Sequence, residues 1–217
     1  MKKIFFALSL LAFATCSLAQ TGWETPANTT NGQRQERKAL FGNNTTKVIE
    51  PKYQKGAVTE ENGKVCWEKT FELPGQSASQ VYDKTLAVMQ EFVKTDKQSP
   101  KSAVAVVNKD GRQIGVRLCE KLVFASKALS YDATDFNYFL LIACSDGKCT
   151  VKMTNLSYFY EAGRPTEARY SAEEMISDAV AFNKKGTKYT KGGTKKFREK
   201  TIDRKDEVFA WIEAELK

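Results

Sequence analysis

Two hairpins constrain the fold of this chain most strongly. One spans residues 103–124 around the turn Asn-Lys-Asp-Gly at 108–111, and the other spans residues 136–158 around the turn Ser-Asp-Gly-Lys at 145–148. Turns this short join neighbouring antiparallel strands, whereas parallel strands need a long crossover. The sequence therefore predicts four consecutive strands in an antiparallel meander.

The segment before the meander predicts one more strand and a helix. Residues 65–73 alternate apolar and polar side chains with a period of two, which is typical of a strand with one buried face. Ser77 and Gln80 then match the pattern of a capping box. In this motif the side chain of each residue accepts a hydrogen bond from the backbone N–H of the other. We expect this helix to continue to about Lys94.

Two helices are expected after the meander. Ser171 and Glu174 repeat the capping-box pattern and predict a helix to about Asn183. Apolar side chains three and four positions apart predict a last helix within residues 194–216. The order is strand, helix, four strands and two helices. This order indicates an α+β fold, an antiparallel sheet of about five strands with helices packed mainly on one face.

The strand at 136–144 is apolar on both faces, because Phe139 and Leu141 alternate with apolar neighbours. A sheet with helices on one face normally shows polar residues on the other. Either the C-terminal helix covers the second face, or that face meets a ligand or partner. Aromatic rings can bind sugars or acyl chains, although they also pack in cores. The candidate binding face comprises Phe136, Tyr138, Phe139, Tyr158 and Tyr160.

The N-terminus predicts export. Two lysines precede an apolar run, and Ser17-Leu18-Ala19 offers a signal-peptidase site, so we expect residues 1–19 to be a signal peptide cleaved before Gln20. The polar residues 20–47 are expected to be a flexible leader. The mature protein would act in the periplasm or outside the cell, with no transmembrane segment. Alternatively, Cys16 lies in a lipobox-like context and anchors a lipoprotein.

Four cysteines remain in the mature chain. Cys144 and Cys149 flank the second turn, which places them on facing strands, and we expect them to form a disulfide. Cys66 and Cys119 would pair by elimination, but only if their strands are adjacent. The Cys144–Cys149 spacing also admits a metal site, yet the chain has no histidine and few thiols. We therefore expect no metal.

Positive charge is concentrated near the C-terminus, in a chain whose formal net charge is +8. Clustered lysines attract anions such as lipid phosphates or acidic glycans. A solvated Lys/Gly loop is the alternative interpretation. The candidate anion contacts are Lys184, Lys185, Lys188, Lys191, Lys195 and Lys196.

The sequence lacks the residues that most familiar catalytic mechanisms require. Without histidine there is no Ser-His or Cys-His nucleophile. No nucleotide-binding, calcium or haem motif occurs, so no cofactor is expected. Two acidic pairs, Glu60-Glu61 and Glu173-Glu174, are the candidates for a carboxylate-based enzyme. Their loop and helix-start positions indicate surface acids.

Four short motifs, at residues 52–58, 62–65, 71–75 and 81–84, resemble a known family: Lys-Tyr-Gln-Lys-Gly-Ala-Val, Asn-Gly-Lys-Val, Phe-Glu-Leu-Pro-Gly and Val-Tyr-Asp-Lys. The chain is similar to the exported Bacteroides-type domain of unknown function with a fold like the TATA-box-binding protein. The resemblance implies a curved antiparallel sheet backed by helices. It implies neither DNA binding nor catalytic residues, since a fold does not carry function.

These observations divide the chain into the signal peptide, the leader, a TBP-like α+β domain at 48–183, and a basic loop with the C-terminal helix at 184–217. We expect a non-catalytic binding module of the periplasm or cell envelope, with a lipid, glycan or envelope protein as ligand and no nucleic acid. The alternative is an envelope assembly protein that forms oligomers through its sheet. A carboxylate-based enzyme is the third hypothesis.

Overall fold

The computed structural model describes residues 48–127 and 130–217. The expected signal peptide, the leader and Cys16 lie outside these residues. Within them, no helix has the length and apolar character needed to cross a membrane.

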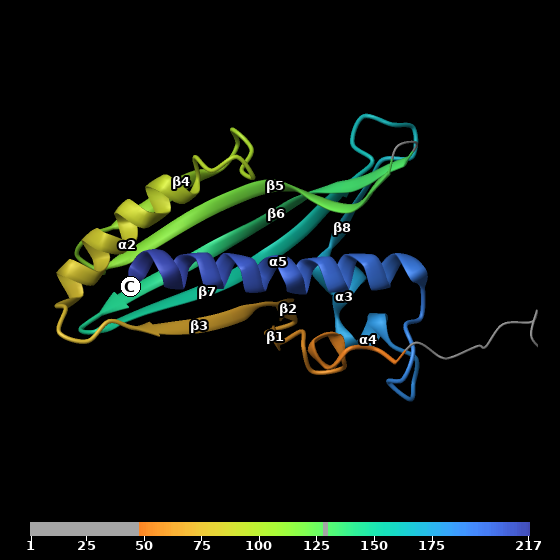
Figure 1. Cartoon of the computed structure of the whole chain (residues 1–217), viewed down its shortest axis with the longest axis horizontal. Helices are drawn as coiled ribbons and strands as arrows, with labels where there is room; N and C mark the ends of the chain where they lie inside the picture. The colour runs from red at the N-terminus through yellow and green to blue at the C-terminus, as the bar shows by residue number, and fades with distance from the viewer. Residues whose placement is uncertain (1–47, 128–129) are drawn as a thin grey trace, which may run out of the picture. The chain divides into compact units, whose positions relative to one another are not determined.

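One antiparallel sheet of six strands dominates the described chain, as Figure 1 shows. Its strand order is β3-β7-β6-β5-β4, and β8 pairs with β7 beyond the end of β3. The strands are β3 (Trp67–Glu72), β4 (Ala103–Asn108), β5 (Gln113–Lys127), β6 (Ser130–Ser145), β7 (Lys148–Tyr160) and β8 (Ala168–Ser171). The expected meander is therefore confirmed as β4 to β7. β8 and a small separate hairpin of β1 (Glu60–Glu61) and β2 (Lys64–Val65) were not expected from the sequence.

The helices begin where the capping patterns predict. Ser77 caps α2 and Ser171 caps α3, and both capping boxes are complete. The expected helix at 171–183 is instead two short helices, because Ser177 adopts an extended backbone with ψ of 152°. The elements are η1 (Pro51–Tyr53), α2 (Ala78–Phe92), α3 (Ala172–Ile176), α4 (Asp178–Ala181) and α5 (Gly192–Leu216).

The core lies between one face of the sheet and the helices. Leu118, Tyr138 and Met153 from three adjacent strands are fully buried there, together with Met89 of α2 and Ile212 of α5. Figure 1 shows α5 crossing the strands. Burial of alternate strand residues against these helices removes apolar area from water, which is the main stabilising contribution to such a fold. Within the described residues, no helix lies on the opposite face of the sheet.

Arg198 of α5 ties the segments around this core together. Its side chain is fully buried, and it donates hydrogen bonds to the carbonyl oxygens of Tyr53, Gln54 and Ile176. The guanidinium also lies 2.8 Å from the carboxylate of Asp178. That oxygen is off the line of a hydrogen bond, so the contact is an ion pair by proximity. Arg198 thus fixes η1, α3 and α4 against α5.

Candidate functional site

The face of the sheet away from the helices carries exposed apolar side chains. A row crosses five strands at the same level, from Glu68 through Lys152, Leu141 and Gly115 to Val106. Leu141 is 48% exposed and Val106 is 64% exposed. Gly115 has no side chain between these two, so a hollow of about 530 Å³ forms there.

We call the apolar part of this surface the open face and define it as Val106, Gly115, Phe139, Leu141 and Ala143. Every residue that lines the hollow comes from β3 to β7 or their ends, and none comes from a helix. The strand that is apolar on both sides, β6, therefore buries one side under the helices and exposes the other side to solvent. The interpretation in which the C-terminal helix covers this second face is wrong.

The open face continues to an unpaired strand edge. β4 pairs with β5 on one side, and its other edge has no strand partner in the described chain. Natural edge strands are commonly protected by charged residues, proline or a bulge. β4 has a register shift between Val104 and Val106 but no charge or proline between Ala103 and Asn108, and Val107 is 55% exposed. Backbone hydrogen-bonding groups and apolar side chains are thus available together.

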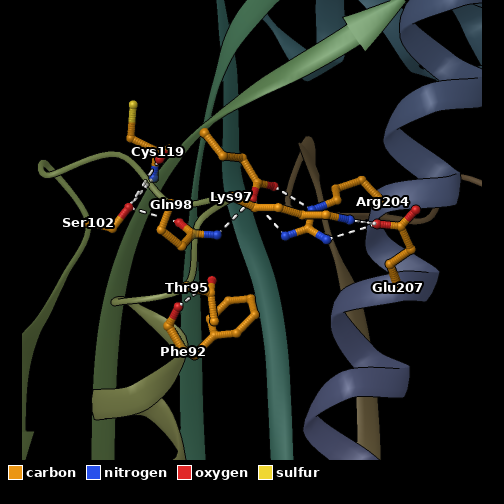
Figure 2. Close-up of polar contacts among 9 residues, drawn as sticks. Phe92, Thr95, Lys97, Gln98, Ser102, Cys119, Arg204 and Glu207 are labelled. Atoms are coloured by element: carbon orange, nitrogen blue, oxygen red, sulfur yellow. Dashed lines mark hydrogen bonds and ion pairs between the residues drawn. The ribbon is translucent and has the colours of Figure 1, made fainter.

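A second hollow, of about 1140 Å³, lies between α5, β5 and the segment that follows α2. Its lining includes Glu120, which is 3% exposed. Glu120 accepts hydrogen bonds from Arg204 at 2.8 and 2.7 Å and from Gln98 at 2.7 Å, in the network of Figure 2. Burial alone lowers the pKa of Arg204, but the hydrogen bonds to Glu120 outweigh it and raise that pKa.

The charges of this second hollow are largely satisfied within the protein. Arg204 also donates to Glu207, which accepts from Lys97 as well. The lining carries as many acidic as basic side chains, so it has no net attraction for an ion of either sign. Tyr138 beside Glu120 has a buried hydroxyl with no hydrogen-bond partner among the described residues, and burial raises its pKa well above the usual value. This network joins α5 to β5, which is a structural role.

The structure places most of the predicted aromatic face in the core. Phe136, Tyr138 and Tyr158 are buried under the helices, and the Phe136 ring stacks on the other two. Tyr158 also bonds Thr201 of α5 at 2.8 Å. These three cannot contact a surface ligand, because they lie on the covered side of β6 and β7. Only Phe139 of the predicted set belongs to the open face.

Tyr160 lies at the other end of the sheet, in a cluster with Lys196. The ammonium of Lys196 is 2.8 Å from Asp132 and 3.0 Å from the Tyr160 hydroxyl, and it lies over the Phe124 ring. Lys196 is thus engaged within the fold. The remaining candidate anion contacts are exposed, and their role stays a prediction: Lys184, Lys185, Lys188, Lys191 and Lys195.

Cys144 and Cys149 lie directly opposite each other across the β6–β7 hairpin, as expected from the turn. Both are free thiols in this structure, and so are Cys66 and Cys119. A hydrogen bond between the two hairpin thiols lowers the pKa of Cys144 and raises that of Cys149. The expected pairing of Cys66 with Cys119 is wrong. β7 and β6 separate β3 from β5, so the two residues lie about 14 Å apart or more, beyond the reach of a disulfide.

The acidic pairs do not form a site. Glu60, Glu61 and Glu174 are exposed. Glu173 is partly buried and accepts a hydrogen bond from the backbone of Val65 at 2.8 Å. Across residues 48–127 and 130–217, no group of three Cys, Asp or Glu side chains is arranged to hold a metal ion.

Known proteins share this architecture. Residues 67–159, from β3 to β7, match the family described as "Domain of unknown function (DUF4468) with TBP-like fold". No curated protein matches the chain. A TBP-like protein from Parabacteroides distasonis shares the fold, with 22% identity and a TM-score of 0.58 over 73% of this chain and 96% of that one. The crystal structure of a DUF4468 family protein from Bacteroides ovatus is 33% identical, with a TM-score of 0.71, and the match covers 77% of this chain and 95% of that chain. This chain therefore belongs to the DUF4468 family of domains with a TBP-like fold.

Proposed function

We propose that this domain is a non-catalytic binding module of the cell envelope whose ligand is a polypeptide, bound at the open face and the β4 edge. One observation carries the proposal: exposed apolar side chains on a sheet face without helices are continuous with an unpaired strand. An exposed apolar patch bordered by polar residues is typical of an interaction site. The envelope location follows from the N-terminal sequence, which predicts export.

The shape of the open face favours a polypeptide over a lipid or glycan. Small-molecule sites generally bury about 70–90% of the ligand between opposing walls. Here the lining comes from a single sheet and its strand ends, so no described part of the chain closes over a bound molecule. Phe139 is the one aromatic side chain in the lining, and it is half-buried. An extended polypeptide suits this surface, because it can cover the patch and pair its backbone with β4.

The border of the open face fits a protein interface as well. Glu68, Asn108, Gln113, Thr150 and Lys152 surround the apolar centre. Lys152 already pairs with Glu61. Protein interfaces commonly combine an apolar centre with a polar rim that excludes water and sets orientation. Affinity is then expected from the apolar centre as a whole, and specificity from the rim.

Site-specific photo-crosslinking in living cells tests this proposal. The photoreactive amino acid p-benzoylphenylalanine replaces Leu141 in one strain and Val180 in a control strain. Val180 is a comparably exposed apolar residue of α4, 38% exposed, and it does not line the hollow. We expect irradiation to produce a discrete protein adduct from position 141 and none from position 180. Adducts with lipid alone, or equal protein adducts from both positions, refute a polypeptide ligand at the open face.

A further inference from the structure

We infer that the polypeptide at the β4 edge is a second copy of this chain, paired antiparallel with β4 about a two-fold axis. The inference rests on the proposed function and assigns the partner of the β4 edge, whereas the open face remains the binding surface for another polypeptide. Three features of β4 carry it: the order of its side chains on the two faces, the charges beyond its ends, and its continuity with the open face.

The side chains of β4 alternate in a pattern that is the same in both directions. Val104 and Val107 lie opposite buried residues of β5, on the helix side of the sheet. Residues 103, 105, 106 and 108 lie on the open side, because the register shift inserts Ala105 beside Val106. The pattern is therefore symmetric about the point between Ala105 and Val106.

This symmetry selects one register for self-pairing. In an antiparallel pair, residues directly opposite each other share a face of the sheet. Centring the two-fold axis between Ala105 and Val106 places Val104 opposite Val107 of the second copy, and Ala105 opposite its Val106. Every position then meets a position on the same face. A slip of one residue would place helix-side positions opposite open-side positions, which disfavours other registers.

The same register pairs opposite charges. Lys101 and Asp110 lie in turns two residues beyond the two ends of β4, so this register brings Lys101 of each copy near Asp110 of the other. Both residues are exposed, and neither makes an ion pair within the described part of the chain. Two favourable charge attractions thus form for each dimer.

Pairing through β4 also joins the two open faces. Val106 of each copy lies beside Ala105 of the other, so the apolar hollows become parts of one continuous surface across the two-fold axis. A self-complementary patch of this kind gives a closed dimer, in which both exposed strand edges are satisfied. The extended sheet would have no unpaired β4 edge.

Charge reversal with purified protein tests the pairing. The dimer dissociation constant is measured by multi-angle light scattering and sedimentation over a concentration series. We expect wild type to dimerise, and Lys101→Asp or Asp110→Lys alone to raise the dissociation constant about tenfold or more, since each change replaces two attractions by two repulsions. The double variant Lys101→Asp/Asp110→Lys should restore it. Lys185→Asp, at an exposed lysine without an ion pair in the described chain, is the matched control and should not change it.

The other outcomes separate this inference from the proposed function. A wild-type protein that stays monomeric at every concentration overturns self-pairing, whereas crosslinks from position 141 to a different protein leave the polypeptide-binding function standing. A dimer that the double variant does not restore overturns the β4 register. Circular dichroism of each variant establishes that it is folded. Loss of the dimer can then be attributed to the changed interface rather than to unfolding.

Discussion

Replacing Arg198 by methionine removes the cation that holds η1, α3 and α4 on α5. Methionine keeps the apolar stem of the side chain, so the loss is confined to the guanidinium and its partners. Three backbone carbonyls lose their donor, at 3.0, 2.6 and 2.7 Å in the wild type, and the nearby Asp178 loses its cation. Hydrogen bonds to charged groups contribute about 1.5–3 kcal/mol each, but bonds of one group do not add independently.

We expect a loss of about 3–5 kcal/mol in the free energy of unfolding, as for a buried ion pair broken from one side. The lower part of this range applies if water reaches the freed carbonyls of Tyr53 and Gln54, because Gln54 is exposed. Urea unfolding followed by tryptophan fluorescence measures the change. Trp67 is buried in the core and reports on its packing.

The control is Lys200→Met, an exposed lysine two positions further along α5. It should change the unfolding free energy by less than about 0.5 kcal/mol. An Arg198→Met variant that loses less than about 1 kcal/mol, with an unchanged dependence on urea, contradicts the structural role derived for this residue.

Two further predictions concern the hairpin thiols and an ion pair of α5. Oxidised glutathione should close Cys144 and Cys149 into one disulfide by thiol–disulfide exchange, and each bond formed releases two molecules of reduced glutathione. The intact mass of the protein should then fall by two hydrogens. Mixed glutathione adducts without closure contradict the cross-strand geometry. Burial alone raises the pKa of Asp203, but hydrogen bonds from Lys52 and Tyr53 outweigh it and lower that pKa below 3.8. The resulting stability is therefore fully present above about pH 4 and is lost as pH falls through the folded-state pKa. Asp203→Asn should reduce stability at neutral pH and flatten the decline below pH 4 in thermal unfolding, and an unchanged acid slope contradicts this assignment.

Local signals in the sequence were sufficient for the meander and for the starts of two helices. The turns at 108–111 and 145–148 are short, so the strands that they join must be antiparallel neighbours, and the meander followed directly. Ser77 and Ser171 begin helices because their side chains satisfy free backbone donors, which is a local interaction. The break at Ser177 was not foreseen, since the apolar spacing continues through it.

Features that depend on strand order were beyond the sequence. The side chains of residues 136–144 are apolar on both faces of the strand, so the sequence pattern does not tell which face the helices cover. Phe136 and Tyr138 lie inside and Leu141 lies outside only because α2 and α5 pack on one side. Likewise, the apolar strand at 103–107 has the composition of an interior strand, yet β4 lies at an edge. The pairing of Cys66 with Cys119 was wrong for the same reason.

The most direct test of the open face is its coverage in the cell. A single thiol is introduced by Leu141→Cys, with Val180→Cys as the control, and the rate of labelling by a permeable maleimide is compared between living cells and dilute purified protein. The four native cysteines of the described chain are buried, so the new thiol dominates the signal. We predict that labelling at position 141 is slowed in cells by at least about tenfold relative to position 180, because a polypeptide covers Leu141 there. Equal labelling of both positions in cells and in dilute solution contradicts the account, since the open face would then be free where the protein works.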